Sequence, residues 1–145
     1  MVLPARAAGT TTLHFYSVQQ TFTATDAAGQ PITSSTATLP VGDHLDATDL
    51  DYVGNHKHHA SSFSASDHIA CTVTSATTAT CSAQLAIGGS LLLSHDFTVA
   101  FGQKATTGPT QINAGTGKYK NARGTVSSTS ITNSNNSDVT FTLTG

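Results

Sequence analysis

Apolar and polar residues alternate in short runs along this chain, and that period most constrains its fold. The clearest run covers residues 61–73, where most odd-numbered positions are apolar: Phe63, Ala65, Ile69, Cys71 and Val73. The positions between them are mostly serine, threonine and histidine. A period of two places successive side chains on opposite faces of a β-strand, whereas a helix needs a period near 3.6. The pattern therefore predicts strands.

The composition supports an all-β domain and excludes several classes of partner. The 145 residues include 26 Thr and 16 Ser, no Glu, and only 10% charged residues, which favours strands over surface helices. This length is typical of one domain. A formal net charge of −2 provides no basic field for nucleic acid or an anionic membrane. No run of 18 apolar residues occurs, so no membrane span is predicted.

The alternation and its turn signals predict about eight antiparallel strands. Besides residues 61–73, the predicted strands cover residues 11–22, 43–53, 81–87, 90–101, 111–113, 123–132 and 138–144. Such strands protect their edges by closing into a barrel or by stacking as a sandwich, and the pattern does not distinguish the two. We expect residues 1–10 to be a flexible N-terminal remnant and residues 11–145 to form a single barrel domain.

Two cysteines lie on either side of a turn-like segment. Cys71 and Cys81 are ten positions apart, and antiparallel strands flanking residues 74–79 could bring their sulfurs together. Two free thiols or half of a metal site are the alternatives. A disulfide in a Thr- and Ser-rich chain with few charges is typical of a secreted, extracellular protein.

One segment resembles a known family. Residues 112–126 contain Gly115-Thr116-Gly117, Tyr119 and Ala122-Arg123-Gly124, which resembles the Gly-Thr-Gly-x-Tyr-x-x-Ala-Arg-Gly signature of the allene oxide cyclase and dirigent protein superfamily. The upstream features Val41-Gly42-Asp43, Asp49-Leu50-Asp51-Tyr52 and Cys71…Cys81…Gly88-Gly89 follow in the order that secreted bacterial members show. The resemblance covers residues 11–144. It implies an eight-stranded antiparallel, calycin-type β-barrel with a ligand cavity, assembled as a homo-oligomer, either trimer or dimer.

The resemblance also implies a function. Such a barrel binds a hydrophobic small molecule and directs its cyclisation, isomerisation or stereoselective coupling, acting mainly by confining one conformer of the substrate. No cofactor is expected. The chain departs from plant dirigent proteins after Phe15-Tyr16, where Ser17, Val18 and Gln19 replace the expected His-Asp pair, which argues against lignan-type coupling. The alternative is a non-catalytic secreted barrel that binds a ligand or a metal.

Strand alternation selects the candidate catalytic residues. Over residues 90–101, His95 shares a face with Leu91, Leu93 and Phe97, and if that face lines the cavity a neutral imidazole there could act as a base. Asp67 interrupts the apolar face of its own strand, and a buried carboxyl has a raised pKa suited to a general acid. The structural alternatives are a hydrogen-bonded histidine and an aspartate paired with arginine or backbone amides.

Three further groups are candidates for binding. Leu91, Leu93 and Phe97 would form the wall of the cavity. Tyr16 and Tyr52 could offer hydroxyls to a ligand there, although packing in the core is the alternative. His56 and His58, two residues apart in an extended chain, could hold Zn²⁺ or Cu²⁺ together with a nearby aspartate. The alternative for that segment is a solvated polar turn.

Overall fold

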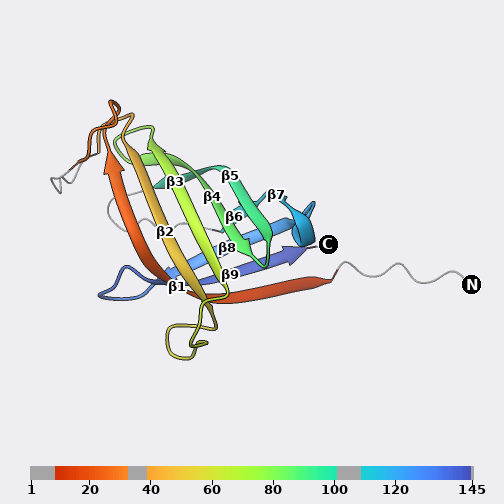
Figure 1. The fold of residues 1–145 in the computed structure, drawn as a ribbon. Coiled ribbons are helices and arrows are strands. Elements are labelled where there is room, and N and C mark those ends of the chain that lie inside the picture. Colours follow the sequence, from red (N-terminus) through yellow and green to blue (C-terminus); the bar gives the residue numbers. More distant parts are fainter. Residues whose placement is uncertain (1–8, 33–38, 101–108, 145) are drawn as a thin grey trace, which may run out of the picture.

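The computed structural model describes residues 9–32, 39–100 and 109–144. Most of the predicted N-terminal remnant, residues 1–8, and the last residue of the predicted strand 90–101, Phe101, lie outside the described residues. The strands run in chain order around one axis (Figure 1): β1 (Thr10–Thr25), β2 (His44–Val53), β3 (Ala65–Val73), β4 (Thr78–Ile87), β5 (Ser90–Ala100), β6 (Thr110–Ile112), β7 (Ala114–Gly115), β8 (Arg123–Ser130) and β9 (Ser137–Thr144). In these ranges the helical structure is a 3₁₀ turn, η1 (Gly117–Tyr119), and no helix is long and apolar enough to cross a membrane.

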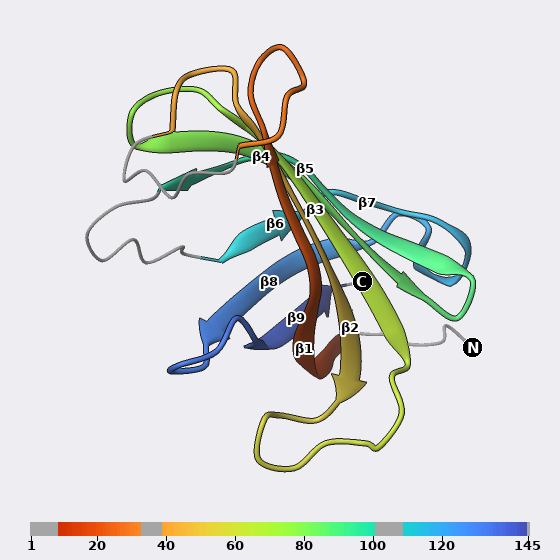
Figure 2. The ribbon, with the colours of Figure 1, turned by 60° about the vertical axis from the view of Figure 1, so that its left-hand side comes forward.

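The strands form a single antiparallel sheet that curls into a nearly closed barrel (Figure 2). The order is β6-β8-β9-β1-β2-β3-β4-β5-β7, so β6 and β7 are the two edges. These edges belong to one segment, residues 110–115. Its first half pairs with β8 through Ile112↔Gly124, and its second half pairs with β5 through Leu93↔Ala114. Counting this segment as one strand gives the predicted eight-stranded barrel, and that prediction is confirmed.

The loop between β2 and β3 is longer than the alternation suggests. The strand β3 begins at Ala65 rather than at residue 61. A bridge between Gly54 and His59, and a hydrogen bond from the backbone N–H of Ala60 to the carbonyl of Val53, hold residues 54–60 as a loop. Phe63 therefore precedes the strand and is 55% exposed instead of continuing the buried face.

The hydrophobic core fills one end of the barrel. Phe15 and Phe141 meet edge to face at 6.0 Å between ring centroids, a favourable geometry for an aromatic pair. Around them pack the remaining buried members of this cluster: Ala65, Leu85, Leu92, Ile112 and Leu143. This core closes the barrel near the start of β3 and leaves the middle of the barrel less filled.

A disulfide joins β3 and β4. Cys71 and Cys81 are direct cross-strand partners, and their sulfurs lie 2.00 Å apart. The predicted bond is therefore confirmed, and the free-thiol and metal alternatives for these residues are excluded. Closing a loop of this length stabilises a fold by roughly 3 kcal/mol in the chain-entropy model.

The glycine-rich signature closes the barrel. Gly115 passes so near the carbonyl oxygen of Tyr119 that a Cβ at this position would overlap it. Gly124 has a φ of +145°, and a Cβ there would meet the carbonyl of Thr142 on β9. Both positions need glycine, because the chain turns from β7 through η1 into β8 against a neighbouring backbone. The signature segment thus has a structural role in this chain.

Candidate functional site

A cavity of about 360 Å³ lies inside the barrel, next to the hydrophobic core. Its wall is largely apolar and includes Ile69, Leu92, Phe97, Val99, Ile112 and Phe141. The ionisable residues of the described lining, Asp49 and Asp67, lie on β2 and β3, and neutral polar residues from several strands, such as Ser17, Ser94 and Ser127, line the cavity as well. A concave apolar site with a few convergent polar groups is the usual form of a small-molecule site.

The register of β2 and β3 gathers three carboxyls on the inner face. Asp49 of β2 is the direct cross-strand partner of Asp67 on β3. Asp51 lies two residues further along β2, on the same face, and is 1% exposed. Ser17 of β1 is the cross-strand partner of Asp51, and its hydroxyl donates a hydrogen bond to Oδ1 of that carboxyl. The alternation of three adjacent strands therefore builds one acidic cluster.

The carboxyl of Asp67 holds a proton at neutral pH. Burial raises the pKa of Asp67 from 3.8 to about 10, and a hydrogen bond with Asp49 and the charge of Asp51 add to this rise. A buried carboxyl beside other carboxyls keeps its proton because two like charges are costly in a low dielectric. Asp67 can therefore donate a hydrogen bond to its carboxyl neighbours or to a ligand.

Asp51 lies behind this pair, deeper in the barrel wall. Burial raises the pKa of Asp51, while hydrogen bonds from Asp67 and Ser17 work in the opposite direction. Its second oxygen, Oδ2, is buried and accepts no hydrogen bond from an N–H or hydroxyl group of the described residues. The protonated carboxyl of Asp67 is therefore the donor, besides Ser17, that stabilises this buried carboxyl.

His95 lies outside the cavity, and its predicted placement is wrong. Cys81 pairs with Phe97 and Ala83 pairs with Ser94, so Ser82 alone faces both His95 and Asp96. This β-bulge, where Asp96 has a φ of 55°, reverses the alternation of β5. His95 is exposed as a result, and it is not part of the acidic site.

The same bulge changes which leucines face inward. Leu92 and Ser94 line the cavity before the bulge, and Phe97 and Val99 line it afterwards. Leu91 and Leu93 occupy the alternate positions of β5 and are not among the lining residues, so their predicted placement is also wrong. Of the predicted wall residues, Phe97 does line the cavity.

The two predicted tyrosines lie on the outer face. Tyr16 and Tyr52 alternate with the inward-facing Ser17 and Asp51, and their rings are 6.5 Å apart. His59 packs against Tyr16 at 4.8 Å, and the hydroxyl of Tyr16 accepts a hydrogen bond from the side-chain amide of Asn136. Neither tyrosine lines the cavity, so the prediction that they offer hydroxyls there is wrong.

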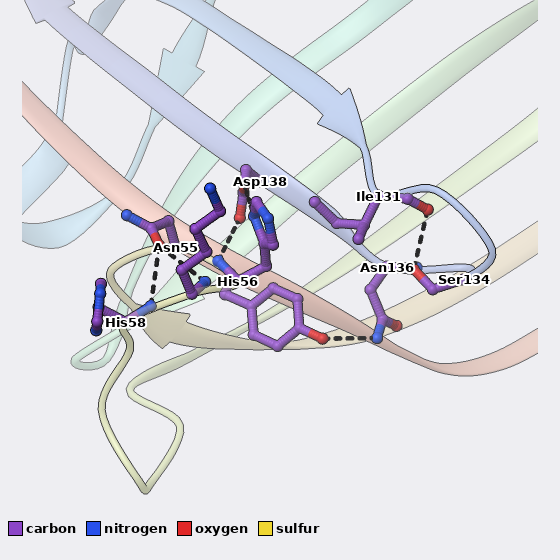
Figure 3. Close-up of polar contacts among 9 residues, drawn as sticks. Asn55, His56, His58, Ile131, Ser134, Asn136 and Asp138 are labelled. Carbon is purple, nitrogen blue, oxygen red and sulfur yellow. Dashed lines mark hydrogen bonds and ion pairs between the residues drawn. The ribbon is translucent and has the colours of Figure 1, made fainter.

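His56 and His58 do not converge on a metal site. The Nδ1 atom of His56 lies 2.5 Å from a carboxylate oxygen of Asp138 on β9. Asn55 accepts hydrogen bonds from the backbone N–H groups of Lys57 and His58, and this turn separates the two imidazoles. Figure 3 shows the His58 ring apart from the His56–Asp138 pair. No group of three His, Cys or Asp side chains suited to a metal occurs in the described ranges.

Of the acidic cluster, Asp67 was predicted from the sequence, whereas Asp49 and Asp51 were not. The signal for them was present, because Asp49 and Asp51 occupy alternate positions of a predicted strand and therefore share a face. Placing that face inside the barrel would have put both carboxyls beside Asp67. The role of Ser17 depends on the pairing of β1 with β2, which the sequence does not specify.

Comparison with known proteins gives a likeness in structure alone. No protein-family model matches the sequence, and no curated protein matches it. Among solved structures, pyocyanin demethylase superimposes with a TM-score of 0.65 at 16% identity, covering 91% of this chain and 99% of that chain.

Two further structures are similar. The pterocarpan synthase dirigent protein PsPTS1 has a TM-score of 0.60 at 18% identity, covering 94% of each chain. The pterocarpan synthase dirigent protein GePTS1 has a TM-score of 0.58 at 18% identity, covering 95% of this chain and 90% of that chain. The chain therefore has the dirigent-like and allene-oxide-cyclase-like barrel fold that its glycine-rich segment predicts.

Proposed function

We propose that this protein is a barrel that binds a hydrophobic small molecule in its cavity and directs a cyclisation or isomerisation there. The observation that carries the proposal is the pair of facing carboxyls, Asp49 and Asp67, at one side of a largely apolar cavity. The likeness in fold supports it, since the similar structures are named for conversions of small organic molecules.

Asp67 is the proposed acid. A carboxyl that stays neutral at pH 7 donates a hydrogen bond to a substrate oxygen and transfers its proton when negative charge develops on that oxygen. Asp49, on the opposite strand, is the proposed acceptor of the proton that the substrate releases. The pair regains its starting state when the proton returns from Asp49 to Asp67, so an isomerisation of this kind needs no redox partner.

The apolar wall is proposed to hold the substrate in one folded conformer. Phe97, Val99 and Ile112 lie on strands that the barrel fixes, and a rigid wall lowers the entropy that remains to be lost on reaching the reactive geometry. Stereochemical control would follow because only one folded conformer fits beside the carboxyls.

Two properties of the whole protein belong to the same proposal. The Cys71–Cys81 disulfide supports secretion, because such bonds persist in oxidising compartments. Large apolar side chains on the outside support a homo-oligomer, either trimer or dimer: Phe22, Val41, Val53 and Phe63 are each more than half exposed. Sedimentation analysis of the full chain would measure the oligomer mass.

The test is a screen followed by product analysis. Hydrophobic small molecules are ranked by the rise in melting temperature that they cause, and the compounds that bind are incubated with protein and analysed by chiral chromatography. We expect Asp67→Asn and Asp49→Asn to lose at least tenfold in turnover while still binding. Asp46→Asn is the matched control, because Asp46 is on the same strand but pairs with His68 on the outside.

Three outcomes would distinguish a catalytic barrel from one that only binds its ligand. Unchanged turnover in Asp67→Asn would remove that residue from the mechanism. Binding without turnover in the wild-type protein would leave a non-catalytic binding barrel. Ala47→Phe should abolish binding because Ala47 lines the cavity, whereas Thr48→Phe, on the outer face of β2, should not.

A further inference from the structure

We propose that the cavity selects its ligand by charge, accepting an organic cation and rejecting a carboxylate. This inference rests on the proposed function, because it specifies the class of molecule that the cavity takes. It would separate this chain from any barrel of the same fold whose substrate is a fatty acid or another organic anion.

The ionisable side chains of the described lining are all acidic. The ionisable side chains that line the cavity are Asp49 and Asp67, and no Lys, Arg or His occurs among the described lining residues. The basic groups of neighbouring strands lie elsewhere: His68 pairs with Asp46 outside the barrel, and His95 is exposed beyond the bulge. No positive side chain of the described wall therefore neutralises the carboxyls from within the cavity.

The buried carboxyl of Asp51 also favours a cation. It is 1% exposed, and its hydrogen bonds come from Ser17 and the Asp67 carboxyl, with no positive side chain among these partners. The two groups that do contact Asp51, Ser17 and Asp67, both line the cavity. A positive ligand bound beside Asp67 would lower the cost of this buried carboxyl through the short distance and low dielectric.

A cation and an anion would interact differently with the carboxyl cluster. Asp49, Asp51 and Asp67 share one inner face, and no positive side chain of the described lining lies among them. A ligand carboxylate would face these carboxyls and find only one carboxyl proton and neutral hydroxyl and amide groups to donate to it. A cation would instead be attracted to the carboxyl oxygens, and its apolar part would pack against Phe97, Leu92 and Phe141.

The size and shape of the cavity restrict the ligand further. A volume of about 360 Å³ is near the lower end of small-molecule sites, which limits the ligand to a small molecule. The ligand class is therefore a small, largely apolar molecule that carries a quaternary or protonated nitrogen.

The test uses three probes of similar shape and different charge at pH 7: 1-methylquinolinium, 1-methylnaphthalene and 1-naphthoate. Binding to the purified full chain is measured by fluorescence titration. We expect the cation to bind at least tenfold more tightly than the neutral probe, and the anion to bind more weakly than both. Equal or tighter binding of the anion would overturn the inference.

Matched variants test whether a carboxyl inside the cavity causes the preference for a cation. Asp49→Asn should reduce the ratio of cation to neutral affinity by about tenfold, because it removes a carboxyl that lines the cavity. Asp46→Asn changes the net charge by the same amount outside the barrel, and it should leave the ratio unchanged. If both variants reduce the ratio equally, the net charge of the protein is responsible and the inference fails.

The controls also separate this inference from the proposed function. If all three probes bind equally and Ala47→Phe abolishes their binding, the cavity takes small molecules without selecting charge, and only the present inference fails. If Ala47→Phe leaves the binding of every probe unchanged, the probes do not occupy the cavity, and the proposed function fails as well. If no probe binds, both fail.

Discussion

Asp67 lies directly across the β2–β3 ladder from Asp49, so two carboxyls face each other inside the barrel. Carboxyls so placed cannot both ionise at low cost, and burial makes Asp67 the one that keeps the proton. This pairing divides two identical side chains into a proton donor and a proton acceptor, which is the division that acid–base chemistry requires.

The first prediction concerns the pH dependence of stability. The pKa of Asp67 is 3.8 in the unfolded chain and about 10 in the folded protein, so the folded state binds more protons between these values. The contribution of Asp67 to stability is fully present below pH 4 and is lost as the pH rises towards 10. Asp67→Asn should therefore raise the melting temperature at pH 8, by roughly 6 °C for a gain of about 2 kcal/mol.

Thermal denaturation between pH 5 and pH 9 measures this effect. The wild-type protein should lose stability through this range more steeply than Asp67→Asn, and the two curves should converge towards pH 5. Asp46→Asn should follow the wild-type curve, because Asp46 is on the outer face. Parallel curves for wild type and Asp67→Asn would show that Asp67 is ionised in the folded protein.

The second prediction concerns Ser17. Its hydroxyl donates a hydrogen bond to Oδ1 of Asp51, a carboxyl that is 1% exposed. Ser17→Ala would remove a hydrogen bond from a fully buried carboxyl, so we expect a loss of about 1–3 kcal/mol in the free energy of unfolding. Urea denaturation measures it. Ser66→Ala, at an outward position of β3, is the control and should change stability by less than about 0.5 kcal/mol.

The third prediction concerns the disulfide. Reduction of Cys71–Cys81, or the double variant Cys71→Ser with Cys81→Ser, should lower the free energy of unfolding by roughly 3 kcal/mol, because the unfolded chain regains the freedom of the closed loop. The urea midpoint with and without reductant gives the difference. Equal midpoints, together with the 2 Da mass gain on reduction, would mean that the bond does not stabilise the fold.

The fold was largely predictable from the sequence, because alternation and turn residues are local signals. The strand content and the possibility of a Cys71–Cys81 bond follow from residues that lie close together in the chain. The choice of a barrel over a sandwich came instead from the resemblance of residues 112–126, and β3 starts at Ala65 rather than at the predicted residue 61. The inward position of Asp67 also follows from the alternation of its own strand.

The rest of the site was not predictable, for two physical reasons. The bulge at His95 and Asp96 reverses the alternation of β5, and no glycine marks it, since Asp96 itself adopts a positive φ. The cavity also inverts the usual pattern of burial. On β1 and β2 the polar Ser17 and Asp51 face inward while Tyr16 and Tyr52 face outward, so the expectation that aromatic residues line the interior selects the wrong face.

The last prediction concerns Asn113, which holds the bulge in place. Its side-chain oxygen accepts a hydrogen bond from the backbone N–H of His95 at 3.0 Å, and its amide donates to the carbonyl of His95 at 3.1 Å. These two hydrogen bonds join β5 to residue 113, which lies between β6 and β7, in place of backbone hydrogen bonds between paired strands. The inward position of Phe97 depends on this bulge, so Asn113 positions a wall of the cavity without touching it.

Asn113→Ala should lower the free energy of unfolding by about 1–2 kcal/mol, as expected for two exposed hydrogen bonds. It should also speed hydrogen exchange at the amide of His95 by at least tenfold, while the amide of Leu85, in the intact β4–β5 ladder, stays protected. Ligand affinity should fall with it, because Phe97 is no longer held inward. Unchanged exchange at His95 would show that β5 keeps its bulge without Asn113, and that other contacts, such as the hydrogen bond from the backbone N–H of Asp96 to Ser82 Oγ, fix the wall of the cavity.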